Sequence, residues 1–449
     1  MSHVFHREPL KALPVAVRGE GAYLVDSNGK RYLDASGGPA VSCLGHSHPR
    51  VIEAIQRQAA ALPFAYSAFF SSQPMEELAD MLMIDAPPGI ERAFFVGSGS
   101  EAIEAALKLA RQYFLEIGQP MRRRFIARRQ SYHGNTLGAL AIGGNEFRRK
   151  PYEAMLVAHR HIAPCYAYRE RRHDETEETY GQRIADELET VILDLGPETV
   201  AAFLAEPVAG ATLGAALPVP GYLQRLRAIC DRYGVLLIFD EVLCGMGRTG
   251  AIYACNDEGV APDLITVAKG LGAGYQPIGG VLASQRVYNA VAGGSGILRH
   301  GHTYMGHTMA CAAALAVQRV IREEHLLDNV RRQAHRLRAT LEERLGNHHH
   351  VGDIRGRGLL VGIELVKDRA SKEPFDPRHR LHHRILQEGL QQGIICYPSG
   401  GCVDGQRGDH VLLAPPFNVD ERQIDEIVEL VALAIDSAIA GLPREGQRA

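Results

Sequence analysis

The sequence predicts an α/β fold, with a mostly parallel sheet flanked by helices in a large domain and a small α+β domain after it. Between residues 75 and 320, short apolar segments alternate with amphipathic ones, which is the order of strands and helices in such folds. The short segments are apolar on both faces, as expected of strands buried in a parallel sheet. The length of 449 residues exceeds one compact core and favours two or three domains.

The predicted elements follow in order along the chain. A hairpin is predicted at 20–36, with Ser27-Asn28-Gly29 as its turn, and a helix at 49–62, between Pro49 and Pro63. The large-domain elements are strands at 92–96, 124–127, 199–205, 235–240, 264–268 and 279–283, and helices at 100–117 and 220–233. The last elements are a helix at 307–346, two strands in 352–365, a helix at 380–392, a strand at 394–397 and a helix at 419–440.

This order of elements predicts the domain boundaries. We expect an N-terminal segment at 1–60, a large domain at 61–325 and a C-terminal small domain at 326–449. Because chain termini often lie close together, the N-terminal segment is expected to join the small domain.

Composition excludes several classes of protein. Hydrophobic residues make up 46%, charged residues 22%, and the net charge is −3, so neither disorder nor a nucleic-acid partner is indicated. No apolar run reaches the roughly 20 residues of a membrane span, and the start of the chain lacks an apolar signal segment. The eight cysteines show no CxxC spacing, so we expect free thiols in a cytoplasmic protein and no metal site.

The first candidate site is the Gly/Ser turn after the strand at 92–96. Ser98, Gly99 and Ser100 open the following helix, and backbone N–H groups at a helix start bind phosphate. The segment Gly97–Ala102 also fits the GxGxxA dinucleotide pattern, but the acidic residue expected roughly 20 positions later is missing. A phosphate site is therefore favoured over a dinucleotide site, and a plain tight turn remains the alternative.

Two further strands end in charged residues. The strand at 235–240 ends in Asp240, where ligand crevices form in α/β sheets. Asp240 could bind a metal, a ribose or a protonated ring nitrogen, or it could cap a helix. The strand at 264–268 leads into Lys269 and a glycine-rich turn. Lys269 is one of only seven lysines in the chain, and an amine in apolar surroundings suits Schiff-base chemistry.

Together these features match the needs of pyridoxal phosphate. The helix start binds a phosphate, the lysine binds an aldehyde, and the acid keeps a pyridine nitrogen protonated so that the ring acts as an electron sink. Tyr132 and His133, in the string Ser131–Gly134, follow the strand at 124–127, and the aromatic ring of Tyr132 could stack on the cofactor. An ordinary core aromatic is the alternative for Tyr132.

The chain resembles the class III, fold-type I pyridoxal-phosphate aminotransferases over essentially its whole length. The strings that carry the resemblance are GSGSEA (97–102), YHG (132–134), AEP (205–207), FDEV (239–242), GRTG (247–250), AKGLGAGYQPIGG (268–280), HTYMGH (302–307) and LLAPPF (412–417).

The resemblance implies a role for each matching residue. Lys269 would form the Schiff base with the cofactor and move the proton during ping-pong amino transfer, and Asp240 would pair with the ring nitrogen. Glu206 would hold Asp240 or the Tyr132 region in place. The other implied cofactor contacts are Ser98, Gly99 and Ser100 to the phosphate, Tyr132 and Val242 to the two ring faces, His133 beside Tyr132, and Thr303 to the phosphate of a neighbouring subunit. A homodimer with shared active sites, or a tetramer, is therefore expected.

Departures from the family pattern bear on the substrate. Related enzymes for ornithine-like or γ-amino substrates read EPIQGE, whereas this chain reads Glu206-Pro-Val-Ala-Gly-Ala, without the gating glutamate. Those enzymes also have an arginine where this chain has Leu412. Both departures resemble enzymes that use ω-amino acids or amines with pyruvate. Arg407 is the candidate for a mobile carboxylate-binding arginine, and Phe64 and Tyr66 are candidates for the substrate pocket.

Three alternatives stay open at this point. One keeps the cofactor but makes the enzyme a decarboxylase, racemase or aminomutase of the same fold. The second is an NADP-dependent dehydrogenase that uses Gly97–Ala102 with Arg128 and Arg129. The third is a binding module of this fold without catalysis.

Overall fold

A seven-stranded sheet forms the centre of the larger part of the molecule. The computed structural model describes residues 3–443 of the chain. The sheet has the order β4-β10-β9-β8-β7-β5-β6, and only β10 runs antiparallel to its neighbours. Its strands are β4 (Ile90–Val96), β5 (Arg124–Arg128), β6 (Arg160–Ile162), β7 (Val200–Ala205), β8 (Leu236–Asp240), β9 (Leu264–Val267) and β10 (Gly279–Ser284). The predicted α/β fold with a mostly parallel sheet is confirmed.

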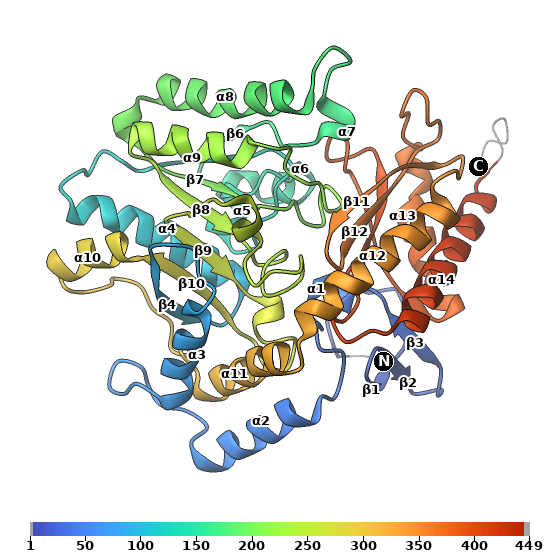
Figure 1. Cartoon of the computed structure of the whole chain (residues 1–449), viewed down its shortest axis with the longest axis horizontal. Coiled ribbons are helices and arrows are strands. Elements are labelled where there is room, and N and C mark those ends of the chain that lie inside the picture. Colours follow the sequence, from blue (N-terminus) through green and yellow to red (C-terminus); the bar gives the residue numbers. More distant parts are fainter. Residues whose placement is uncertain (1–2, 444–449) are drawn as a thin grey trace.

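Helices cover this sheet on both sides, and Figure 1 shows them around the strands on the left of the molecule. Every residue of β7 and β8 is buried, which explains why these strands are apolar on both faces. The helices of this part are α2 (Pro49–Ala61), α3 (Gln73–Met83), α4 (Gly99–Glu116), α5 (Leu137–Ile142), α6 (Glu146–Arg149), α7 (Ala167–Glu170), α8 (Glu177–Leu195), α9 (Tyr222–Tyr233), α10 (Gln285–Gly293) and α11 (Thr308–Glu323).

The smaller part contains an antiparallel sheet covered by three long helices. The sheet has the order β11-β12-β15-β14 and consists of β11 (Val351–Arg357), β12 (Leu360–Leu365), β14 (Tyr397–Gly400) and β15 (Asp409–Leu413). The helices are α12 (Leu326–Leu345), α13 (Leu381–Gln392) and α14 (Glu421–Ala440).

The N-terminal strands lie beside this smaller part (Figure 1). They are β1 (Ala16–Glu20), β2 (Tyr23–Asp26) and β3 (Arg31–Asp34), with the short turn α1 (Gly37–Ala40) after them. β3 pairs in parallel with β13 (Ile394–Ile395), so the N-terminal strands share a sheet with a strand of the smaller part. The domain boundaries at 60/61 and 325/326 stay predictions.

The single helix predicted at 307–346 is wrong, because the structure has two helices there. α11 ends at Glu323 and α12 begins at Leu326, and His325 between them has a φ of 52°. A positive φ at a residue other than glycine breaks a helix, yet no glycine or proline marks the position. α11 packs on α2 and α3 whereas α12 packs on α14, so tertiary contacts decide where the chain turns.

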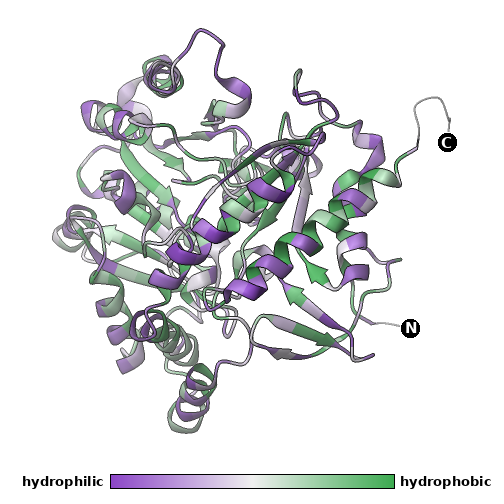
Figure 2. Cartoon of the chain, turned by 45° about the vertical axis from the view of Figure 1, so that its right-hand side comes forward, coloured by the Kyte–Doolittle hydropathy of each residue, from purple (hydrophilic) through white to green (hydrophobic). Residues whose placement is uncertain are grey.

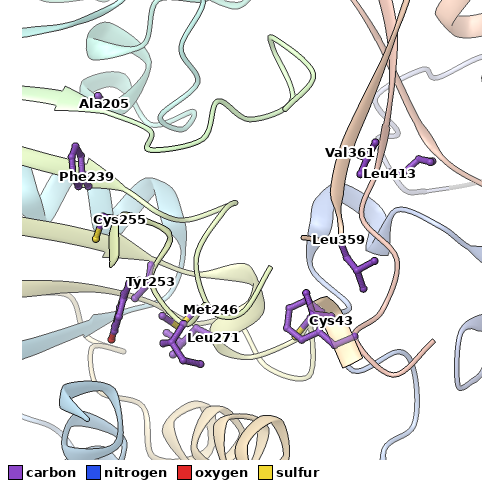
Figure 3. Close-up of a cluster of buried hydrophobic side chains, with 14 of the residues drawn as sticks. Cys43, Ala205, Phe239, Met246, Tyr253, Cys255, Leu271, Leu359, Val361 and Leu413 are labelled. Carbon is purple, nitrogen blue, oxygen red and sulfur yellow. The ribbon is translucent and has the colours of Figure 1, made fainter. Parts of the chain in front are cut away.

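One hydrophobic core joins the two parts of the molecule. Figure 2 shows hydrophobic residues concentrated in the strands and hydrophilic residues along the outer helices. Figure 3 follows the core from Phe239 in the large sheet, through Met246 and Leu271, to Leu359 in the turn before β12 and Leu413 in β15. Because this core is continuous, the edge of the large sheet has a fixed position relative to the small domain. No helix in residues 3–443 is both long and apolar enough to cross a membrane.

Buried charges reinforce this junction. Glu364 on β12 is fully buried, and its carboxylate accepts hydrogen bonds from Arg169 Nε and Arg355 Nη1, both at 2.6 Å, and from the hydroxyl of Tyr166. Burial by itself would raise the pKa of Glu364, but the guanidinium groups of Arg355 and Arg169 outweigh it and hold that pKa below its usual value. Arg355 Nη2 also donates to the carbonyl of Leu213, in the loop after β7, at 2.6 Å.

We expect Glu364→Gln to lower the free energy of unfolding by about 3 kcal/mol at neutral pH, because it removes the counter-charge of Arg169 and leaves the buried Arg355 with Asp353 alone. A carboxylate with a lowered native pKa stabilises the fold above its unfolded pKa and ceases to do so as the pH falls through the native value. The difference in the free energy of unfolding between wild type and variant, measured by urea unfolding, should therefore become smaller as the pH falls into the acid range. The control is Glu53→Gln, an exposed partner of Arg57, which should cost less than about 0.5 kcal/mol. Equal effects of the two substitutions would contradict the role of Glu364.

Candidate active site

A cavity of about 1480 Å³ lies where the large sheet meets the small domain. Residues that directly follow four large-sheet strands line it: Ser98 after β4, Glu206 after β7, Asp240 at the end of β8 and Lys269 after β9. The carboxyl ends of neighbouring parallel strands meet at one edge of a sheet, where α/β proteins bind their ligands. Tyr397 to Gly401 of the small domain form part of the opposite wall.

The start of α4 lines one end of this cavity and is suited to bind an anion. The side chain of Ser98 caps the helix by accepting a hydrogen bond from Glu101 N at 3.2 Å. The first N–H groups of a helix have no acceptor within it, and Gly99 and Ser100 supply two of them to the cavity. A Cβ on Gly99 would lie 2.9 Å from Val242 Cγ1, so the close contact between these two cavity residues requires glycine. These features suit a phosphate group.

Asp240 is a buried carboxylate that three groups hold in place. Its side chain is paired with Nδ1 of His133 at 2.8 Å and accepts hydrogen bonds from the N–H of Val242 at 3.0 Å and from the hydroxyl of Thr266 at 3.2 Å. Thr266 is also its register partner on β9, in the strand that leads to Lys269. The residues after Asp240 form turns, so the helix-cap alternative does not apply.

Glu206 contacts the Tyr132 region. Its Oε1 accepts a hydrogen bond from Tyr132 N at 3.4 Å, and Arg128 Nη2 lies 3.3 Å from its Oε2. Burial raises the pKa of Glu206, against the opposing effect of His133 and Arg128. Of the two roles expected for Glu206, these contacts fit the one that fixes the Tyr132 segment.

Lys269 projects from a strained turn into the cavity. It follows β9 after one intervening residue, Ala268, and has a φ of 46°, a left-handed conformation that is uncommon outside glycine and is often found at functional sites. Burial lowers the pKa of Lys269 to about 8, although the negative charges of Asp240 and Glu206 act to raise it. In residues 3–443 no acceptor is found for its amine. A lysine that is partly neutral at physiological pH can attack an aldehyde.

The pKa of Lys269 predicts how cofactor loading depends on pH. Only the neutral amine attacks an aldehyde, and a lysine with a pKa of about 8 becomes mostly neutral above that pH. The rate at which pyridoxal phosphate loads onto the apoenzyme, followed by absorbance, should therefore rise through about pH 8 and then level off. Nα-acetyl-lysine in the same assay provides the reference, because an unperturbed lysine has a pKa near 10.4. A loading rate that keeps rising like that of the reference would contradict the lowered pKa.

The remaining predicted site residues lie outside the cavity of the single chain. Thr303 is exposed between α10 and α11. Phe64 packs edge-on against Tyr304, with ring centroids 5.6 Å apart, and Tyr66 packs against Phe69. Arg407 Nε donates to Asp404 Oδ2 at 2.7 Å, and its side chain is 57% exposed. Its neighbours Asp404, Gly405 and Gln406 do line the cavity.

Sequence reasoning missed several residues that line the cavity. Arg148 lies with its guanidinium carbon 4.9 Å from the ring centroid of Tyr132. Arg7 and Lys150 also line the cavity. The only signal for Arg148 and Lys150 was the basic run Arg148-Arg149-Lys150, a short distance after the YHG string, and Arg7 had none. Arg128 and Arg129, which the dehydrogenase hypothesis needs, do not line the cavity and pair with Glu206 and Glu187.

These groups fit pyridoxal phosphate, and they define a class of protein: the pyridoxal-phosphate enzymes of fold type I. Among the described residues the lysine amine has no acceptor, the carboxylate is held at the adjacent strand end, and the helix start offers N–H groups without an acceptor in the helix. Lys269 would hold the cofactor, Asp240 would face its ring nitrogen, and Ser98, Gly99 and Ser100 would bind its phosphate. In the part of the chain that the structure describes, no cluster of three or more side chains could ligate a metal.

Comparison with known proteins identifies the family. The family model "Aminotransferase class-III" matches residues 5–435. An uncharacterized aminotransferase of Schizosaccharomyces pombe is 45% identical over 98% of this chain and 96% of its own length. A putrescine–pyruvate aminotransferase of Pseudomonas aeruginosa is 35% identical over 96% of this chain and 92% of its own. The crystal structure of the omega transaminase of Pseudomonas jessenii in complex with PMP has a TM-score of 0.92 and 34% identity, and covers 99% of this chain and 98% of that one.

The chain belongs to the class III aminotransferase family. It is a pyridoxal-phosphate-dependent aminotransferase that is similar to omega-transaminases, so the predicted cofactor and class of enzyme are confirmed. The dehydrogenase and the non-catalytic binding module have no support.

Proposed function

We propose that this aminotransferase moves the amino group of an ω-amino acid or an amine to pyruvate by a ping-pong reaction. The observation that carries the proposal is the wall formed by Gly210, Ala211 and Thr212, which lines the cavity without a carboxylate side chain. At this wall, relatives for ornithine-like substrates have their gating glutamate. Leu412, where those relatives have an arginine, is buried in β15. The similarity to an enzyme whose name specifies putrescine and pyruvate agrees with this choice.

Each site residue has a task in this proposal. When bound, pyridoxal phosphate supplies an electron sink for the carbanion formed next to the amino nitrogen. Lys269 accepts the proton from the substrate carbon and returns it at a neighbouring position, which its lowered pKa favours. Asp240, which His133 orients, stabilises a protonated ring nitrogen. Tyr132 and Val242 line the space for the ring, and Glu206 fixes the backbone of Tyr132.

A second copy of the chain completes the site in this proposal. Phe69, Phe70, Tyr304 and Ile297 are each more than 60% exposed, near the segments that carry Tyr66 and Thr303. The hydroxyl of Thr308 donates to the carbonyls of Leu62 and Pro63, so these two segments lie side by side. Apolar side chains gathered on a surface favour a protein interface. We infer that this face pairs two subunits and brings Thr303, Phe64 and Tyr66 to the partner's cavity, in a dimer or a tetramer.

A cytoplasmic location is part of the same proposal. All eight cysteines are free and buried, and none is positioned in a disulfide. Free thiols are typical of a reducing compartment.

A donor and acceptor panel tests the proposed function. The purified holoenzyme is given pyruvate or 2-oxoglutarate with β-alanine, taurine, 4-aminobutyrate, putrescine or 1-phenylethylamine, and the amino acid product is measured. We expect alanine from pyruvate with at least one donor, and a rate at least about tenfold lower with 2-oxoglutarate. Equal or faster reaction with 2-oxoglutarate would overturn the choice of acceptor. Loss of carbon dioxide, racemisation or migration of the amino group without a keto acid would instead support the decarboxylase, racemase or aminomutase alternatives.

A further inference from the structure

One wall of the cavity carries a positively charged side chain, Arg148, that has no task in the reaction proposed above. The segment after α5 contributes Asn145, Glu146, Phe147, Arg148 and Lys150 to the cavity lining. Asn145 caps α6 by accepting a hydrogen bond from Arg148 N at 3.1 Å, which fixes the backbone at this position. The guanidinium of Arg148 lies over the ring of Tyr132, at 4.9 Å from its centroid. A cation stacked on an aromatic ring is held in orientation while its N–H groups stay free to donate.

Arg148 has no acidic partner. Among residues 3–443, no carboxylate lies within ion-pair distance of its guanidinium. Its neighbour Arg149 differs, because Arg149 pairs with Glu146 at 3.6 Å and does not line the cavity. Arg407 also differs, because Asp404 already neutralises it. An arginine that faces a cavity without a counter-ion is suited to bind an anion there.

The other charges of the cavity leave this wall positive. The carboxylates of Asp240, Glu206, Glu146 and Asp404 each have a basic partner, namely His133, Arg128, Arg149 and Arg407. In the described part of the chain, Glu153 is the one lining acid without an ion pair, whereas three lining cations, Arg7, Arg148 and Lys150, have none. The net excess of positive charge attracts an anionic ligand into the cavity.

The position of Arg148 indicates which end of a substrate it would meet. Lys269 comes after β9, whereas Tyr132, on which Arg148 stacks, comes after β5, and the strands β8 and β7 lie between these two in the sheet. Arg148 therefore lies away from the reacting amine, although both residues line the same cavity. An anion at Arg148 would belong to the far end of a substrate whose amino group is at Lys269.

We propose that Arg148 binds the distal carboxylate of an ω-amino acid donor. Its guanidinium donates paired N–H groups to the two carboxylate oxygens, while Arg7 and Lys150 add positive charge to the same cavity. This inference rests on the proposed function and specifies its donor class, namely amino acids whose carboxylate is separated from the amino group by several carbons. It assigns to Arg148 the task that sequence comparison suggested for Arg407.

A matched pair of donors tests the proposal. In 4-aminobutyrate and butylamine the amino group is carried by chains of the same length, and the carboxylate of one replaces the methyl group of the other. For Arg148→Ala we expect kcat/KM to fall about 10- to 100-fold with 4-aminobutyrate, mostly through KM, which is the usual effect of losing a charged hydrogen bond. With butylamine, kcat/KM of Arg148→Ala should stay within about twofold of wild type. Arg148→Lys, which keeps the charge but loses the paired geometry, should lie between wild type and Arg148→Ala.

Two further variants serve as controls. Arg160→Ala removes an exposed arginine that pairs with Asp194 and does not line the cavity, so both donors should react as with wild type. Arg407→Ala is the direct competitor. If Arg407→Ala impairs only 4-aminobutyrate while Arg148→Ala does not, the carboxylate site belongs to Arg407 and the proposal is wrong. Equal loss on both donors for Arg148→Ala would also overturn it, because Arg148 would then support Tyr132 and not the substrate.

Binding of butyrate separates this proposal from the proposed function. Butyrate has the carboxylate but no amino group, so calorimetric titration into the holoenzyme reports on the anion site without turnover. We expect wild type and Arg160→Ala to bind butyrate, and Arg148→Ala to bind it at least about tenfold more weakly. If wild type rejects every amino donor but Arg148 still governs butyrate binding, the proposed function fails and the anion site stands. If butyrate binds equally to all variants, the anion site at Arg148 is wrong whatever the reaction.

Discussion

Replacing Lys269 with alanine is expected to lower kcat by about 10⁴-fold, at the upper limit of what a positioned proton-transfer group contributes. Lys269 lies in the cavity two residues after the buried strand β9, and burial lowers its pKa to about 8. In the proposed function, its replacement removes the one group that would both hold the cofactor aldehyde and move the proton. The variant should therefore also lose the absorbance of the covalently held cofactor, although the phosphate-binding start of α4 remains.

Steady-state rates and absorption spectra of purified protein check this prediction. Lys108→Ala is the matched control, because Lys108 is an exposed lysine on α4. That variant should keep the rate and spectrum of wild type. Turnover of Lys269→Ala within about tenfold of wild type would show that another group performs the chemistry.

The second large effect is expected for Asp240→Asn. Asp240 is a 96%-buried strand-end acid held by His133, Val242 and Thr266, so its charge is fixed where the ring nitrogen would lie. The amide keeps the shape but loses the negative charge, and kcat should fall about 10²- to 10³-fold, as is typical when one preorganised electrostatic partner is removed. Cofactor content should change much less, because Lys269 and the start of α4 are intact.

The same substitution should shift the pH dependence of cofactor loading. The negative charge of Asp240 raises the pKa of Lys269, so its removal should move the midpoint of loading below about pH 8. Asp186→Asn, at an exposed carboxylate that pairs with Arg225, should leave both the rate and the midpoint unchanged. An upward shift of the midpoint in Asp240→Asn would contradict the electrostatic account of the site.

Some of this site could be predicted from the sequence because its residues have a local signature. Asp240 and Lys269 each follow an uninterrupted apolar strand, and Ser98 to Ser100 join a strand to a helix. The parallel sheet then brings such strand ends to one edge without further information. The mostly parallel sheet and the small α+β domain could be predicted for the same reason, since both follow from the local order of apolar segments.

Other features depend on contacts that no local pattern contains. The break at His325 lacks glycine and proline and results from the different packing of α11 and α12. Arg148 is found only through its stacking on Tyr132, after the chain has turned back beside the strand end. Nothing in the local sequence indicates that Arg128 contacts Glu206, since the chain is rich in arginine, yet the fold buries Arg128 against Glu206.

The most direct test of the central claim is a single-turnover measurement on the holoenzyme without any keto acid. An amino donor should convert the cofactor from its aldehyde form to its amine form, with loss of the absorbance of the aldehyde form, and added pyruvate should restore that absorbance and yield one equivalent of alanine per site. This is the result that the account of Lys269 and Asp240 predicts. Failure of every amino donor to cause the change, or failure of every keto acid to reverse it, would contradict amino transfer at this site.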